Sequence, residues 1–226
     1  MTLYDDEETL SKYSKDSSIF QIRPTAVFYP KTSDDIKSLV KYVTANNLSI
    51  TPRSGGTDMS GAAIGEGIIL DVSKYMNKLI SLGETAIVEP GMYYRDFEAG
   101  TLKKGLLLPT YPASREICTV GGMTANNAGG ELELTYGPIN KYIKKMKVIL
   151  ADGNEYTVTA LNQAQLNKKI AQKDFEGKIY SNVYNLIEAN RKIIAKTKPK
   201  TSKNSTGYDL WEVWDGENFD LSKLII

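Results

Sequence analysis

The chain has 226 residues, 41% of them hydrophobic, and its 28 Lys and Arg residues nearly balance 27 Asp and Glu residues, giving a formal net charge of +1. This length allows one large domain or two smaller lobes that share a core. The balanced charge argues against a nucleic-acid-binding protein, which normally carries a clear basic excess. The absence of histidine and the single cysteine, Cys118, exclude an internal disulfide and a cysteine-cluster metal site, and we expect no metal.

The first ten residues are acidic and polar, unlike a signal peptide, and no apolar run approaches the length of a membrane span. With only one cysteine, a reducing, cytoplasmic setting fits best, and peripheral association with a membrane stays open.

The N-terminal part of the chain predicts a strand, a helix and a second strand, after a polar lead-in of 18 residues. Residues 23–30 read as an extended segment between two prolines. Thr32 and Asp35 form a capping box ahead of apolar residues at helical spacing, and residues 48–52 read as a strand. This order favours parallel pairing of the two strands.

Further elements follow from the same patterns. They are strands over 67–72 and 85–89, a helix over 93–104 that stops at Gly105, a hairpin of 145–150 with 155–159 around Asp152-Gly153, Lys-rich helices over 161–174 and 178–196, and a polar loop over 198–207. Two long loops of small residues remain, 53–67 and 106–130. Such loops are usually functional or disordered, and their low charge disfavours disorder.

The first loop has the composition of an anion-binding loop. Gly55 and Gly56 permit positive φ, so that successive backbone amides can point inward, and Ser54, Thr57 and Ser60 add hydroxyl donors. The segment is neither a Walker loop nor a G-x-G-x-x-G turn, and a flexible surface loop is the plain alternative. We expect Asp58 to point outward or to cap a turn.

The second loop suits a flat ligand. Its small side chains permit close approach of the backbone, and Asn126 and Asn127 can both donate and accept hydrogen bonds at the edge of a heterocycle. The alternative is that Asn and Gly merely build turns, which explains one Asn-Gly pair better than two Gly-Gly pairs and two Asn within ten residues.

In combination, these segments resemble the FAD-binding domain of the vanillyl-alcohol oxidase / p-cresol methylhydroxylase superfamily. The branch that they resemble most is that of the FAD-linked 2-hydroxyacid dehydrogenases, such as glycolate oxidase large subunits and D-lactate dehydrogenases. The resemblance covers residues 16–226, and it rests on Asp16 to Pro30, Pro52–Ala62, Val88-Glu89-Pro90-Gly91, Pro112–Gly130, Tyr136-Gly137, Leu150-Ala151-Asp152-Gly153 and Gly207-Tyr208-Asp209-Leu210.

The resemblance implies an α+β fold of two lobes, with FAD held between them. A small N-terminal lobe with a parallel sheet would span about 16–85, and a larger, mainly antiparallel lobe about 86–226. It further implies that the amides of Ser54–Ser60 hold the pyrophosphate, and that the second loop lies against the flavin or its ribityl chain. The predicted cofactor-binding residues are Arg53, Ser54, Gly55, Gly56, Thr57, Asp58, Ser60, Gly61, Pro112, Ser114, Thr119, Gly121, Gly122, Asn126, Gly130 and Tyr136.

Relatives of this kind oxidise a 2-hydroxy acid by hydride transfer to flavin N5. In the family a further glycine-rich motif and a substrate-binding cap domain with catalytic histidines would follow Ile226. We therefore expect the chain to be a fragment that is inactive alone, with its small-molecule substrate bound by the cap domain; the sequence names neither the base nor the electron acceptor.

Two other functions stay open. One is a non-catalytic flavin-binding or electron-transfer subunit with a partner subunit, suggested by an apolar tail over 219–226 that we expect to be exposed. The other is a reductase like that of UDP-N-acetylmuramate synthesis, disfavoured because its Gly-x-Gly-Ser-Asn loop is absent.

Four single residues carry weaker expectations. Cys118 lies near the flavin-linked cysteine of berberine-bridge-type relatives, but we expect a small apolar residue and non-covalent FAD. We expect Lys203 to be solvated rather than bound to phosphate, and Trp211 and Trp214 to be residues that pack against the missing half of the protein.

Overall fold

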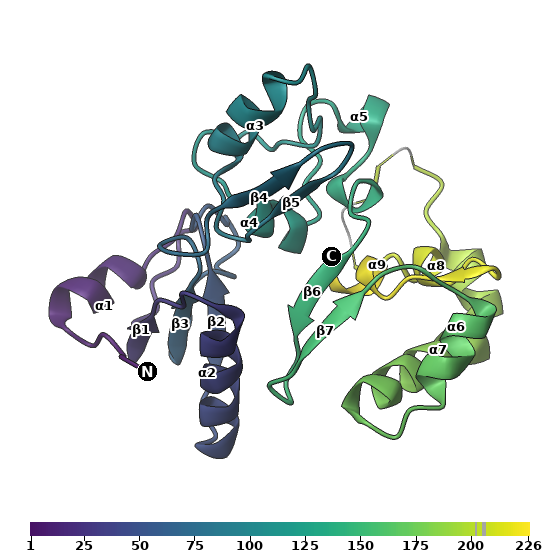
Figure 1. Ribbon diagram of the computed structural model, residues 1–226, viewed down its shortest axis with the longest axis horizontal. Helices are drawn as coiled ribbons and strands as arrows, with labels where there is room; N and C mark the ends of the chain where they lie inside the picture. Colours follow the sequence, from purple (N-terminus) through teal and green to yellow (C-terminus); the bar gives the residue numbers. More distant parts are fainter. Residues whose placement is uncertain (202, 205–206) are drawn as a thin grey trace.

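The computed structural model describes residues 1–201, 203–204 and 207–226, and its N-terminal lobe is built on a parallel sheet (Figure 1). The strands are β1 (Ala26–Phe28), β2 (Ile50–Arg53) and β3 (Ile68–Asp71), in the order β1-β3-β2. Both pairings are parallel, as the pattern favoured, but β1 and β2 pair with β3 between them and not with each other. The central strand β3 is buried throughout, as expected for a strand covered on both faces.

Helix α2 (Ser33–Ala45) connects β1 to β2 and begins at the predicted capping box. The Thr32 side chain accepts a hydrogen bond from the Asp35 amide, and the Asp35 carboxylate accepts one from the Thr32 amide. Leu39 and Val43 then face the sheet and pack against β1 and β3. The strand–helix–strand order of the N-terminal lobe is therefore confirmed.

Helix α1 (Glu7–Tyr13) lies in the segment expected to hold no element. Asp6 caps it by accepting a hydrogen bond from the Thr9 amide at 2.9 Å. It buries only Leu10 and Tyr13, so its apolar pattern is too short to be seen in the sequence.

The middle of the chain packs above the parallel sheet in Figure 1. Its elements are β4 (Leu79–Leu82), β5 (Ala86–Val88), α3 (Tyr94–Leu102), α4 (Val120–Ala125), α5 (Glu133–Tyr136) and a 3-10 turn (Ile139–Lys141). Strands β4 and β5 are antiparallel, and β4 was not predicted because it alternates poorly and is half-exposed. Helix α4 lies within a segment expected to be irregular throughout. Its buried Val120 and Met123 join one core with Tyr94 and Ile139.

The C-terminal part begins with the predicted hairpin, β6 (Met146–Ile149) and β7 (Glu155–Val158), with Gly153 at φ +73° in its turn. The remaining elements are β8 (Leu161–Asn162), α6 (Gln163–Ile170), α7 (Phe175–Thr197), α8 (Leu210–Val213), β9 (Asn218–Phe219) and α9 (Ser222–Ile225). The mainly antiparallel character is confirmed, although among the described residues it takes the form of separate two-stranded sheets. Residues 202, 205 and 206 of the predicted 198–207 loop lie outside the described part.

The expectation of an exposed apolar tail is wrong. Phe219 and Leu221 are buried in a core with Tyr180, Ile187 and Trp214, and the Trp214 indole donates to Glu188 at 2.7 Å. Helix α7 supplies the apolar face that covers them, which a linear sequence does not reveal. Trp214 is therefore a packing residue, but it packs within this chain and not, as predicted, against a missing half.

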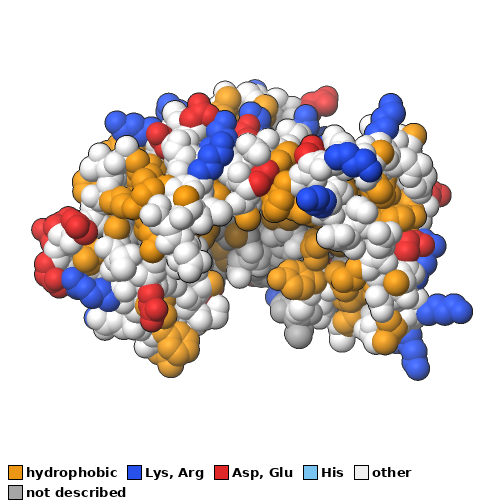
Figure 2. Space-filling model, turned by 90° about the horizontal axis from the view of Figure 1, so that it is seen from below, with side chains coloured by type: hydrophobic (Ala, Val, Ile, Leu, Met, Phe, Trp, Pro, Cys, Tyr) orange, Lys and Arg blue, Asp and Glu red, His pale blue; other side chains and the backbone are white. Residues whose placement is uncertain are grey.

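The hairpin β6–β7 joins the two halves of the molecule by resting beside α2 (Figure 1). Seen from below, the molecule is hollowed between the N-terminal lobe and the unit formed by α6 and α7 (Figure 2). Among the described residues, no helix is both long and apolar enough to cross a membrane.

Candidate functional site

The two loops of small residues face each other across a cleft of about 210 Å³. One wall is the segment from Pro52 to Asp58 with Ala62 and Ala63. The other wall is formed by Pro112, Ser114, Cys118, Thr119, Gly122, Met123, Ala125, Asn126 and Ala128. Segments about sixty residues apart in sequence thus form one site.

The two walls touch at Ser54 and Gly55. The Ser54 and Thr119 hydroxyls share a hydrogen bond of 2.5 Å across the cleft. Next to it, a Cβ on Gly55 would stand 2.5 Å from the carbonyl oxygen of Ile117, closer than real side-chain contacts allow. Glycine is required at position 55 because the two backbones come so close.

The first wall presents free backbone donors. Gly56 has φ +64°, which turns the loop as the sequence predicts. Within the described part of the chain, the amides of Gly55, Gly56 and Thr57 have no intramolecular acceptor. Successive unpaired amides in a glycine turn form an anion-binding nest. The donor set therefore fits a diphosphate group.

Asp58 does not place its charge in this nest. Its carboxylate accepts hydrogen bonds from the Ser60 amide and hydroxyl and from the Ala62 amide, at 2.7, 2.9 and 2.8 Å. Desolvation raises the pKa of Asp58, but these hydrogen bonds outweigh it and the pKa falls below its usual value. Asp58 caps its own turn, as expected.

The second wall is shaped by the start of α4. Thr119 is the N-cap of that helix and accepts a hydrogen bond from the Gly122 amide at 3.1 Å. Asn126 ends the helix and is exposed, with its side-chain amide beside the cleft. Both polar ends of a two-turn helix thus border the site.

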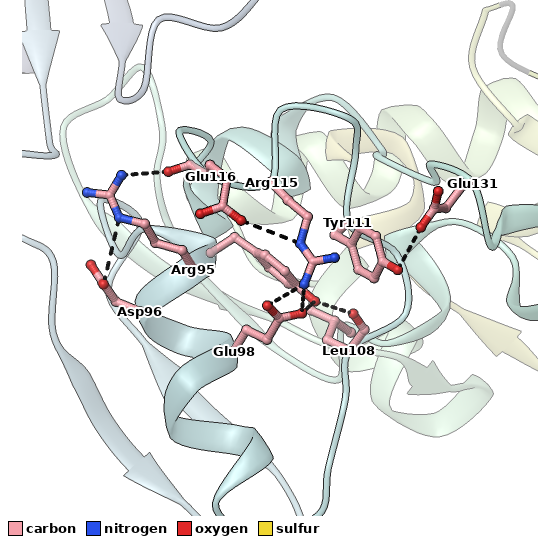
Figure 3. Close-up of polar contacts among 9 residues, drawn as sticks. Arg95, Asp96, Glu98, Leu108, Tyr111, Arg115, Glu116 and Glu131 are labelled. Carbon is pink, nitrogen blue, oxygen red and sulfur yellow. Dashed lines mark hydrogen bonds and ion pairs between the residues drawn. The ribbon is translucent and has the colours of Figure 1, made fainter.

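The loop before α4 is held by a polar network (Figure 3). Arg115 donates to both oxygens of the buried Glu98 carboxylate, at 2.6 and 2.5 Å, and its guanidinium lies 4.4 Å from the centre of the Tyr111 ring. Tyr94 donates to the Leu108 carbonyl at 2.7 Å. These contacts fix the loop that carries Pro112 and Ser114.

Comparison with known proteins identifies the cofactor. The family model of the FAD binding domain matches residues 24–159, more than half of the chain. The chain belongs to this family of FAD-binding domains.

Two curated relatives of this chain are named after 2-hydroxy acids. The D-2-hydroxyglutarate dehydrogenase of Pantoea ananatis is 30% identical over 233 residues, which cover 99% of this chain and 22% of the relative. The glycolate oxidase subunit GlcD of Bacillus subtilis is 29% identical, over 94% of this chain and 45% of the relative. The chain thus spans less than half the length of either protein.

A solved structure shares the mixed helix-and-strand fold of this chain. The 6-hydroxy-D-nicotine oxidase of Arthrobacter nicotinovorans superposes with a TM-score of 0.62 at 24% identity, over 69% of this chain and 35% of that one. At this identity the likeness concerns the fold alone.

Of the sixteen residues predicted to bind the cofactor, eleven line the cleft of the FAD-binding domain. The other five, which do not line it, are Ser60, Gly61, Gly121, Gly130 and Tyr136. Gly121 packs on the backbone of Pro90, and a Cβ on Gly130 would meet the Tyr111 carbonyl oxygen at 1.9 Å. These two glycines shape the second wall through close packing.

The sequence interpretation missed several small apolar residues of the cleft. They are Ala62, Ala63, Met123, Ala125 and Ala128, together with Pro52 and Cys118. Their only signal was the scarcity of large side chains in both loops. Lys203 lies outside the cleft and is exposed to solvent, as predicted, and it pairs with Glu133 at 2.6 Å.

Proposed function

We propose that this FAD-binding domain serves an enzyme that oxidises a 2-hydroxy acid, with lobes of about 16–85 and 86–226. The observation that carries the proposal is the nest of unpaired amides at Gly55, Gly56 and Thr57, which faces the small-residue wall of α4 across one cleft. The names of the relatives, a D-2-hydroxyglutarate dehydrogenase and a glycolate oxidase subunit, support the class of substrate.

Each wall has a distinct role in the proposal. The amides of the first wall, with the Ser54 and Thr57 hydroxyls, hold the diphosphate. The second wall presents Pro112, Ser114, Gly122 and Asn126 to the flavin and ribityl chain. When bound, FAD supplies the hydride acceptor for the oxidation.

The groups that bind and deprotonate the substrate are proposed to lie outside these 226 residues. The sequence holds no histidine to act as the base, and the curated relatives are more than twice as long. A cytoplasmic location and association with a partner subunit belong to the same proposal, which leaves the electron acceptor open.

Titration of the purified chain with flavins tests the function. FAD is expected to bind more tightly than riboflavin, because only FAD carries the diphosphate that the nest can hold. Gly56→Ala should weaken FAD binding by about tenfold, since Gly56 has positive φ within the nest. Gly105→Ala is the matched control, because Gly105 has φ +69° with no atom nearby and lies away from the cleft. Equal affinity for FAD and riboflavin would contradict the proposal.

The cofactor is proposed to be held non-covalently. The sequence offers no histidine for a flavin link, and Cys118 is buried, which raises the pKa of its thiol and disfavours the nucleophilic thiolate. Acid precipitation of the FAD-loaded chain should leave the yellow colour in the supernatant. A yellow pellet from the unaltered chain, together with a colourless pellet from the Cys118→Ser variant, would show that the flavin is attached covalently.

A further inference from the structure

The guanidinium of Arg53 packs against Gly56 of the amide nest. Its Nη2 atom stands 2.6 Å from the position that a Cβ on Gly56 would take, so the glycine leaves the space that the guanidinium fills. Its Nη1 atom donates to the Ala63 carbonyl at 3.3 Å and thereby bridges the two ends of the loop. Within the described residues, no carboxylate lies within ion-pair distance of Arg53. A half-buried positive charge is thus left for an anion.

Tyr13 of α1 holds this guanidinium in place. The guanidinium carbon lies 5.1 Å from the centre of the Tyr13 ring, a distance typical of cation–π contacts, and Nη1 also reaches the Tyr13 carbonyl at 3.5 Å. Tyr13 is itself buried and therefore presents one fixed ring face to the loop.

The position of Tyr13 is fixed in turn by Asp71 at the end of β3. The Tyr13 hydroxyl donates to one Asp71 oxygen at 2.5 Å, and the Ser73 amide and hydroxyl donate to the other oxygen at 2.7 and 2.6 Å. Burial and the Asp71 carboxylate raise the pKa of Tyr13, so the phenol stays protonated as the donor. Asp71 is also the register partner of Arg53 in the parallel sheet.

Two further contacts bring the segment after α1 against the same loop. The Ser17 hydroxyl donates to the Gly56 carbonyl at 3.4 Å, and the Phe20 ring lies 3.0 Å from the position of a Cβ on Gly61. Residues 13–20 precede residue 24, where the match to the family begins. They nevertheless cover the rear of the loop.

We infer that residues 13–20 are part of the cofactor site, with Tyr13 and Arg53 as positioning residues for the diphosphate. The inference rests on the proposed function. Asp71 orients Tyr13, Tyr13 orients the Arg53 guanidinium, and the guanidinium sets the loop and adds a positive charge next to its amides. Ligands with a diphosphate should depend on this arrangement, and ligands without one should not.

Binding of FAD, ADP and riboflavin to the 226-residue chain tests the inference. Arg53→Met keeps the apolar stem and removes the charge, so FAD and ADP should bind about tenfold more weakly, as for the loss of a charge-assisted contact, while riboflavin affinity stays unchanged. Tyr13→Leu should weaken the binding of FAD and ADP to the same extent as Arg53→Met. Tyr13→Phe keeps the ring beneath the guanidinium but loses the hydrogen bond to Asp71, so its FAD affinity should lie between those of Tyr13→Leu and the unaltered chain.

Amide hydrogen exchange separates this inference from the proposed function. In the ligand-free Arg53→Met variant, the loop amides that donate to Asp58, those of Ser60 and Ala62, should exchange faster, with the amides of the β6–β7 hairpin unchanged as a check on folding. If the unaltered chain binds neither FAD nor ADP, the proposed function fails and the exchange result alone decides whether Arg53 sets the loop. If the chain binds FAD but Arg53→Met and Tyr13→Leu bind FAD and ADP equally well, the inference is overturned and the proposed function stands.

Discussion

Arg115→Met should lower the melting temperature of the domain by roughly 5–10 °C, because it leaves a buried carboxylate without its charged partner. Glu98 is 8% exposed and receives hydrogen bonds of 2.6 and 2.5 Å from Arg115, whereas its remaining contact, with the Tyr94 hydroxyl, is long at 3.3 Å (Figure 3). Thermal unfolding of the two proteins in the same buffer measures the change.

The same substitution should weaken FAD binding. Arg115 stacks on Tyr111, whose hydroxyl donates to Glu131 at 2.9 Å, so the guanidinium links α3 to the loop that carries Pro112 and Ser114. Without the Arg115 guanidinium, the second wall of the cleft is no longer fixed.

Two variants serve as controls. Glu116→Gln should leave the melting temperature unchanged, because Glu116 is exposed and lies 3.8 Å from Arg115. Adding Glu98→Leu to Arg115→Met should restore much of the lost melting temperature, since no buried charge then remains unpaired. If the Arg115→Met variant has the same melting temperature as the unaltered domain, the pair contributes nothing to stability.

The elements predicted from the sequence are those whose signals are local. The capping box of Thr32 and Asp35 and the turn at Gly153 each lie within a few residues of the element they begin or connect. Helix α1 has a local cap at Asp6, but the helix is short and its buried Tyr13 is held by Asp71, 58 residues further along the chain, so the cap alone did not predict it. Helix α4 was missed because Gly121 and Gly122 are poor helix formers; the Thr119 cap and the buried Met123 compensate.

The same distinction applies to the site. Glycine and hydroxyl content identified which loops form the walls, but not which glycines face the cleft. Gly121 and Gly130 look like cofactor contacts in the sequence, yet their neighbours are Pro90 and the Tyr111 carbonyl. Arg53 lines the cleft, as its place in the predicted set requires, but its contacts with the Tyr13 and Ala63 carbonyls could not be seen in the sequence. Such distinctions depend on pairs of segments that only the fold brings together.

Gly55→Ala should have the largest effect on the cofactor. The new Cβ would stand 2.5 Å from the Ile117 carbonyl oxygen and 3.4 Å from the Cys118 Cα, both of them backbone atoms that no rotamer change can move. The loop must then withdraw from the second wall, which breaks the 2.5 Å hydrogen bond between Ser54 and Thr119. Overpacking of this kind costs about 1–3 kcal/mol of stability.

FAD affinity should fall by about a hundredfold in Gly55→Ala, because the nest and the flavin wall would no longer be at the separation that one dinucleotide spans. Gly83→Ala is the control, since its nearest neighbour for a Cβ is 4.0 Å away and, as at Gly55, φ is not in the left-handed region. Titration with FAD and riboflavin measures both variants. If Gly55→Ala binds FAD as tightly as Gly83→Ala, close approach of the walls is not what holds the cofactor. If the affinity for FAD falls much more than the affinity for riboflavin, the bound ligand must reach both walls at once.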